Sequence, residues 1–211
     1  MRIRRILLQI AAAAVLTILA GAQGLTDGEI LVRVETALGD IDIAIDTKHA
    51  PITAANFLKY VDGKFYDGGR FHRVTRPDNY TPALPDRPAM EIIQGGIDPA
   101  RRSEGFPPIP LERTSLTGLK HVVGTVSMAR GQTADTARSD FFICLDDQPS
   151  LDFGGKRFDD GQGGGAFGRV VKGMDIVRRI QQQPTNEKGE TPIARQTLLA
   201  AVTITRMARI Q

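Results

Sequence analysis

Apolar and polar residues alternate in several short segments of this chain, and two of these segments lie close together near its start. Residues 30–35 and 40–45 both alternate, and Leu38-Gly39 between them favours a turn. In the second segment Ile41, Ile43 and Ile45 share one face, because successive side chains of a strand point to opposite sides. The pattern predicts a hairpin whose isoleucines face the interior of a barrel.

Two helices and six more strands are predicted downstream. One helix runs from Pro51 to about Asp62, since proline suits the first helical turn and a glycine follows. The other runs from about Met174 to Gln182. The strands are predicted at 71–74, 91–95, 122–129, 140–145, 166–171 and 197–207. Eight strands just fill a barrel interior with side chains, and closure leaves no open edges. We therefore expect an all-β fold, a closed antiparallel eight-stranded barrel capped by two α-helices.

The first 22 residues do not fit the barrel pattern. Residues 1–5 carry three arginines, 6–20 are almost wholly apolar, and Ala20-Gly21-Ala22 fits a small-x-small cleavage site. The apolar run is shorter than the roughly 20 residues that span a bilayer. We expect residues 1–22 to be a signal peptide and 23–211 to be one exported, periplasmic domain. An uncleaved N-terminal anchor is the alternative.

Removal of this segment would change the charge of the protein. The segment holds three of the 27 Lys and Arg residues and none of the 24 Asp and Glu residues, so the remainder holds 24 of each sign. The basic pI therefore gives no reason to expect a nucleic-acid partner. The single cysteine, Cys144, cannot form an internal disulfide. We expect a monomer with no stable membrane association after cleavage.

Motifs for several enzyme classes are absent or lie in the wrong context. His49, His72 and His121 are far apart and lack the spacing of metal ligands, so no metal or cofactor is expected. The chain has no HExxH, Walker or GxSxG motif. Residues 163–168 match GxGxxG, but they lead into a predicted strand, whereas a dinucleotide site needs a helix there. A lipocalin-type ligand barrel is disfavoured by the order of strands and helices.

Five segments, in this order along the chain, resemble signature segments of the cyclophilin family. They are 51–57 (PITAANF), 71–74 (FHRV), 92–96 (IIQGG), 127–129 with 139–143 (SMA and SDFFI), and 167–174 (FGRVVKGM). Together they extend over almost the whole of the predicted mature domain. The resemblance implies an eight-stranded barrel with a proline-binding groove on its outer face, and peptidyl-prolyl cis/trans isomerase activity on proline-containing unfolded or exported polypeptides.

The resemblance also implies the roles of individual residues. Arg73 matches the catalytic arginine, Gln94 the glutamine that positions it, and Phe142 the floor of the proline pocket. The residues assigned to the substrate-binding site are Phe71, Ile92, Met128, Ala129, Arg130 and Leu151, and Ala129 matches a backbone contact to the peptide. The chemistry agrees, because rotation about an X–Pro bond breaks no covalent bond and needs no nucleophile or metal. A rigid, charged donor that favours the twisted amide is sufficient.

Two features depart from the cyclophilin pattern. The chain has no tryptophan, and Leu151 lies in the loop where the family often carries a groove tryptophan; the groove histidine is also missing. Residues 75–90 form a proline-rich insertion between two motifs that the family places closer together. A proline-peptide binding module or chaperone with weakened turnover is therefore the alternative function.

Overall fold

The structure is a computed structural model in which residues 25–79 and 89–211 are described. The predicted signal peptide, 1–22, lies outside the described residues, and so does the central part of the insertion, 80–88. Within the described part, no helix is long and apolar enough to cross a membrane.

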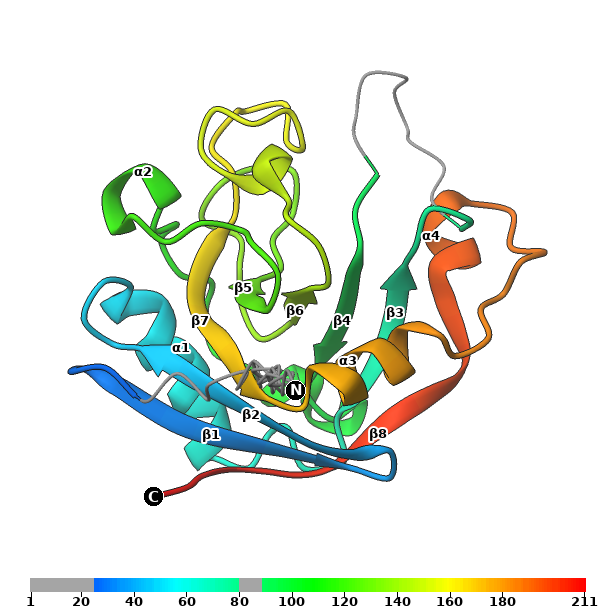
Figure 1. Ribbon diagram of the computed structural model, residues 1–211, viewed down its shortest axis with the longest axis horizontal. Helices are drawn as coiled ribbons and strands as arrows, with labels where there is room; N and C mark the ends of the chain where they lie inside the picture. The colour runs from blue at the N-terminus through cyan, green and yellow to red at the C-terminus, as the bar shows by residue number, and fades with distance from the viewer. Residues whose placement is uncertain (1–24, 80–88) are drawn as a thin grey trace, which may run out of the picture.

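Eight antiparallel strands close into a barrel, as predicted, in the order β1-β2-β7-β5-β6-β4-β3-β8 (Figure 1). Closure pairs the first strand with the last, so residues from both ends of the chain meet in one sheet. The strands are β1 (Glu29–Thr36), β2 (Gly39–Asp46), β3 (Arg70–Thr75), β4 (Ile92–Gly96), β5 (Thr125–Met128), β6 (Phe141–Cys144), β7 (Gly165–Lys172) and β8 (Thr197–Arg209).

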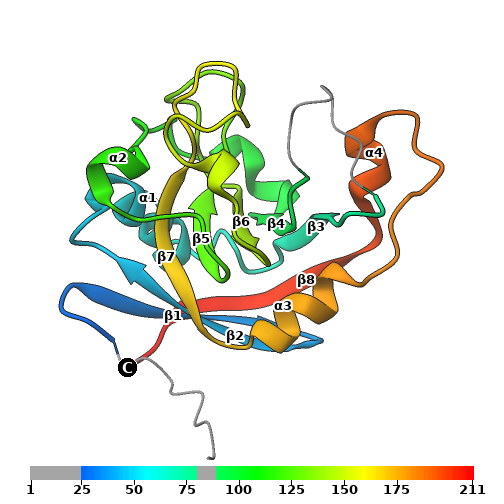
Figure 2. The same cartoon turned by 45° about the horizontal axis from the view of Figure 1, so that its top comes forward.

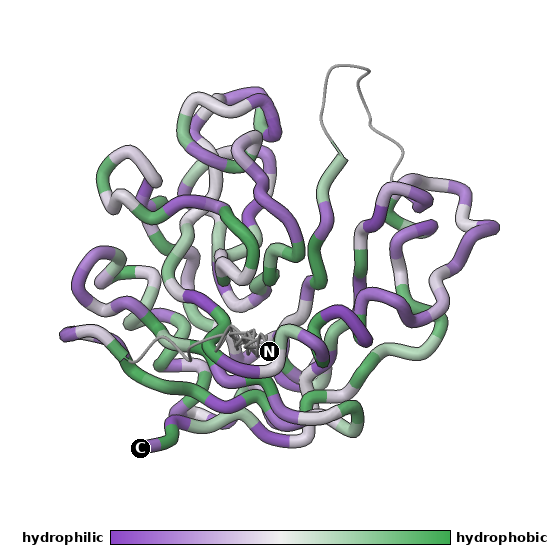
Figure 3. Tube along the Cα trace, in the orientation of Figure 1, coloured by the Kyte–Doolittle hydropathy of each residue, from purple (hydrophilic) through white to green (hydrophobic). Residues whose placement is uncertain are grey.

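The opening hairpin forms where the alternation placed it. Hydrophobic and hydrophilic residues are mixed along β1 and β2 (Figure 3), and Ile41, Ile43 and Ile45 are fully buried inside the barrel. The turn needs Gly39, whose φ of +126° disfavours other residues. A Cβ on Gly39 would also lie only 2.7 Å from Cδ1 of Ile176. The turn therefore packs closely against the helix that contains Ile176.

The two predicted helices are the long ones, α1 (Pro51–Asp62) and α3 (Met174–Gln181). Figures 1 and 2 show them on different sides of the barrel. From α1, Phe57 inserts its ring among Tyr66, Phe141 and Phe167, with ring centroids 5.0–5.6 Å apart. In a chain without tryptophan, this aromatic cluster fills one part of the core.

Four shorter helical segments form in addition to the two predicted helices. Two shorter α-helices, α2 (Thr114–Thr117) and α4 (Pro192–Gln196), and two 3₁₀ turns, η1 (Pro99–Glu104) and η2 (Pro149–Leu151), also form. Helices of four or five residues show little periodicity, so the hydrophobic pattern could not reveal them. The local signal for α4 is its start, where the Thr191 hydroxyl accepts a hydrogen bond from the Ala194 N–H and Pro192 follows the cap.

The strand predicted at 122–129 begins only at Thr125. Val122 and Val123 are 47% and 45% exposed. The Val122 N–H donates to the Thr125 hydroxyl, and Gly124 has a φ of +83°. These contacts make 122–124 a turn that leads into β5, although valine favours strands.

Candidate active site

A cavity of about 280 Å³ lies on the outer side of β3, β4 and β6, and we call it the β4 cavity. The connection from β6 to β7 supplies one wall and α4 the other; Figures 1 and 2 show β3 and β4 lying between these two segments. Of the nine residues singled out by the sequence, seven line this cavity: Arg73, Ile92, Gln94, Ala129, Arg130, Phe142 and Leu151. The fold therefore brings these distant motifs together.

The floor of the β4 cavity is apolar because of strand alternation. In β6, Phe141 is fully buried in the barrel core, whereas Phe142 lies on the other face. Gln94 is the cross-strand partner of Phe142, and Ile92 that of Cys144. The floor is a small cluster outside the main core, formed by Met90, Ile92, Phe142, Cys144 and Leu151. Burial raises the pKa of the Cys144 thiol, which is consistent with a packing role.

The sequence placed Phe71 and Met128 at the substrate-binding site, but neither residue lines the cavity. Phe71 is fully buried and packs against Phe141 at 5.7 Å between ring centroids. Met128 is 2% exposed and belongs to the same barrel core. A β-bulge between Phe71 and Arg73 shifts the register of β3. Simple alternation would put these two residues on one face, but the bulge turns Phe71 inward and Arg73 outward.

Arg73 lies at the edge of the cavity between two glutamines. Its Nη1 donates to Oε1 of Gln94 at 2.9 Å. Its Nε and Nη2 both donate to Oε1 of Gln196, at 2.9 and 2.6 Å. The sequence predicted the first contact but missed the second, because Gln196 belongs to α4 and to none of the recognised motifs.

Arg130 lines the cavity, but its polar atoms bind other groups of the protein. Its side chain is 1% exposed and forms an ion pair with Asp160, at 2.8 Å. Its Nε donates to the carbonyl oxygen of Gly163 at 2.8 Å, and its guanidinium lies 3.6 Å from the ring centroid of Phe158. Arg130 therefore fixes the β6–β7 connection and places Phe158 in the cavity wall. An aromatic residue is thus present in the wall of a groove that lacks tryptophan.

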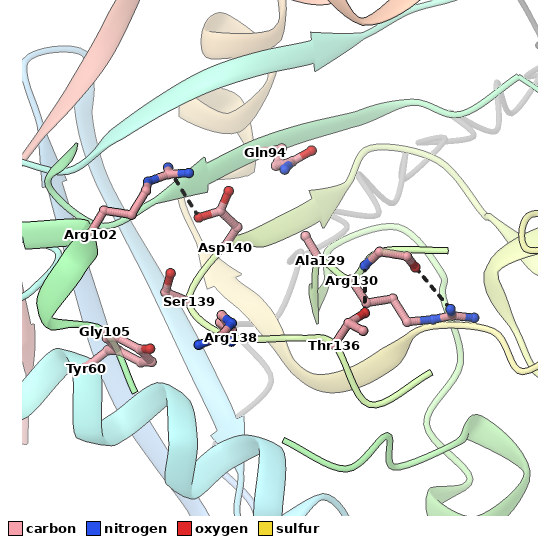
Figure 4. A pocket seen from close by; sticks show the side chains of 11 residues that line it. Tyr60, Gln94, Arg102, Gly105, Ala129, Arg130, Thr136, Arg138, Ser139 and Asp140 are labelled. Carbon is pink, nitrogen blue, oxygen red and sulfur yellow. Dashed lines mark hydrogen bonds and ion pairs between the residues drawn. The ribbon is translucent and has the colours of Figure 1, made fainter. Parts of the chain in front are cut away.

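A second cavity, of about 330 Å³, shares Gln94, Ala129, Arg130 and Gly131 with the first. On its far side Arg102 and Asp140 face one another, with Nη2 and Oδ1 separated by 3.9 Å (Figure 4). The two cavities therefore lie next to each other on the surface.

Comparison with known proteins agrees with this fold. The model of the family described as cyclophilin type peptidyl-prolyl cis-trans isomerase/CLD matches residues 31–208. The chain belongs to this family. Like its relatives, this cyclophilin is a peptidyl-prolyl cis-trans isomerase and acts on proline-containing peptides.

Bacterial relatives are similar over most of the chain. Peptidyl-prolyl cis-trans isomerase A of Dickeya dadantii is 35% identical over 158 residues, which cover 75% of this chain and 74% of the relative. Isomerase B of Escherichia coli is 33% identical over 159 residues, covering 75% and 88%. A crystal structure of a Cryptosporidium parvum cyclophilin in the presence of the dipeptide Ala-Pro has a TM-score of 0.63 at 21% identity. The structural match covers 86% of this chain and 99% of the Cryptosporidium parvum chain, and it supports the fold.

Beneath the cavity floor, this cyclophilin contains a buried Ser–His–Asp arrangement. His121 Nδ1 lies 2.9 Å from Oδ1 of Asp152, and its Nε2 lies 3.0 Å from Oγ of Ser127. The arrangement resembles a hydrolase triad, but Ser127 is fully buried and His121 is 1% exposed, so a substrate cannot reach the hydroxyl. The His121 ring stacks on Phe142, with centroids 6.0 Å apart and planes 16° apart. The network supports the floor of the cavity.

The stabilisation that the Ser127–His121–Asp152 network gives depends on pH through the Asp152 carboxylate. Partial burial alone raises the pKa of Asp152, but hydrogen bonds from the ring and backbone N–H of His121 outweigh this effect, and the pKa lies below its usual value of 3.8. A carboxyl group with a lowered folded-state pKa stabilises the fold above its unfolded-state pKa. This stabilisation is lost as the pH falls through the folded-state pKa.

We therefore expect Asp152→Asn to be less stable than the wild type at pH 7. The difference should start to shrink as the pH falls below about 4, the unfolded-state pKa, and should be lost below the lower folded-state pKa, where the wild-type carboxyl is protonated as well. Urea unfolding followed between pH 2 and pH 7 measures this. Asp27→Asn is the control, because that carboxylate is 96% exposed and should contribute little at any pH. A destabilisation by Asp152→Asn that does not vary with pH would contradict the expectation.

Proposed function

We propose that this cyclophilin accelerates X–Pro isomerisation in exported polypeptides, with Arg73 as the donor that stabilises the twisted amide. The observation that carries the mechanism is the position of Arg73 at the edge of an apolar cavity whose floor contains Ile92 and Phe142. A pyrrolidine ring bound on this floor would place its amide nitrogen within reach of a guanidinium.

The chemistry requires a donor that acts more strongly on the transition state than on the ground state. The rotational barrier of about 18–20 kcal/mol comes from amide resonance, which is lost when the bond is twisted. Loss of resonance localises a lone pair on the proline nitrogen, and a charged N–H donor binds that lone pair better than it binds the planar amide. The guanidinium stays charged at every relevant pH, so this stabilisation does not depend on a proton transfer.

NMR exchange spectroscopy on an Ala-Pro peptide tests this function directly. Catalytic amounts of the domain should speed cis/trans exchange, which without an enzyme takes tens to hundreds of seconds. Shifted peptide resonances without faster exchange would instead identify a proline-peptide binding module, the alternative function.

The proposed role in export depends on residues 1–22. Their basic start, short apolar run and small residues at 20 and 22 support cleavage after Ala22. When the full chain is expressed in a bacterium, we expect the intact mass of the periplasmic protein to correspond to 23–211. A membrane-bound product that retains its three N-terminal arginines would show an anchor instead. We also propose that the mature domain is a monomer, which light scattering on the same sample measures.

A further inference from the structure

The guanidinium of Arg73 is held from two directions by side-chain amides. Gln94 in β4 binds Nη1, and Gln196 at the end of α4 accepts from both Nε and Nη2. Because a guanidinium has only N–H donors, both glutamines must turn their oxygen atoms towards it. Gln196 is 2% exposed, so its bonds to Arg73 are shielded from water.

The chain builds this contact by joining α4 directly to β8. Thr197, the first residue of β8, is the cross-strand partner of Arg73, and Gln196 immediately precedes it. The Thr191 hydroxyl caps the other end of α4 by accepting from the Ala194 N–H at 3.1 Å. Figures 1 and 2 show α4 beside the end of β3. The position of Gln196 beside Arg73 is therefore fixed by a short helix with a capped N-terminus.

Two acceptors fix the guanidinium in a way that one of them cannot. The contact with Gln94 involves one terminal nitrogen, about which the guanidinium plane could still pivot. The forked contact with Gln196 involves the opposite edge of the same plane. A donor that is already oriented needs no rearrangement when the transition state forms, and small displacements of such groups cost much of the rate.

We propose that Gln196 is a second positioning residue for Arg73, and that α4 serves isomerisation by carrying it. This inference rests on the proposed catalytic role of Arg73. Gln196 does not line the β4 cavity and acts only through Arg73.

The decisive variant is Gln196→Leu, which keeps the approximate size of the side chain but removes the acceptor. We expect kcat/KM for an Ala-Pro peptide to fall about ten- to a hundredfold, mainly through kcat, because the apolar floor that binds proline is unchanged. Gln196→Glu retains an oxygen acceptor and should recover part of the loss. The matched control is Gln181→Leu: Gln181 is also a buried glutamine, but its Nε2 donates to the Thr75 carbonyl. This control should keep kcat/KM within about twofold.

A double-mutant cycle separates positioning from a general structural effect. In an Arg73→Ala background, Gln196→Leu should cause no further loss of kcat/KM, because the group that it positions is gone. An equal loss in both backgrounds would overturn the proposal. Full activity of Gln196→Leu, together with a damaged Arg73→Ala variant, would overturn it while leaving Arg73 catalytic. Wild-type activity of Arg73→Ala would instead refute the proposed mechanism itself.

Hydrogen exchange of the Arg73 side chain tests the contact in the wild-type protein itself. The Nε–H of Arg73 donates to a buried oxygen, so its proton signal should exchange slowly with water in the wild type and in Gln196→Glu. Rapid exchange of this proton in the wild-type protein would contradict the inference even if Gln196→Leu did not fold.

Discussion

Replacement of Arg73 by alanine should lower kcat/KM about 10²–10³-fold, by analogy with the loss of a single oxyanion-hole donor. The apolar floor formed by Ile92 and Phe142 stays in place, so peptide binding should change much less than turnover. NMR exchange on an Ala-Pro peptide measures turnover, and a titration of peptide chemical shifts measures binding.

Arg73→Lys should restore little of this activity. Lysine keeps the positive charge, but it lacks the planar fork that binds both Gln94 and Gln196. Near wild-type rates for the lysine variant would mean that charge alone suffices, and an active alanine variant would remove Arg73 from the mechanism.

Replacement of Phe57 by alanine should lower the free energy of unfolding by about 3–5 kcal/mol, the range for removing a large buried aromatic side chain. Phe57 is fully buried and contacts three other aromatic rings inside the barrel, so neighbouring side chains cannot easily fill the space. Urea unfolding should show a lower midpoint with an unchanged slope.

Ile52 in the same helix provides the control for Phe57. It is 45% exposed, and Ile52→Ala should change the free energy of unfolding by no more than about 0.5 kcal/mol. If Phe57→Ala were no more harmful than Ile52→Ala, then α1 would not be anchored through its aromatic side chain.

The sequence alone was sufficient for features that depend on local patterns. Alternation predicted the first hairpin and the inward isoleucines of β2, and proline and glycine marked the limits of α1. Alternation also predicted that Phe141 and Phe142 lie on opposite faces of their strand. In the structure Phe141 lies in the barrel core and Phe142 in the cavity floor. The order of the five motifs identified the family, because several short motifs in one order are much more specific than any single motif.

Tertiary structure decided the features that depend on contacts between distant residues. A bulge in β3, set by its pairing with β4 and β8, sent Phe71 inward and Arg73 outward, whereas alternation would place them on one face. Arg130 matches a substrate-contact position in the sequence, yet its polar atoms bind Asp160 and backbone carbonyls of the protein. Gln196 lies 123 residues from Arg73, and only closure of the barrel through β8 brings the two together. Sequence patterns report the preferences of neighbouring residues, but the partners of a side chain at the site are fixed by how the whole chain packs.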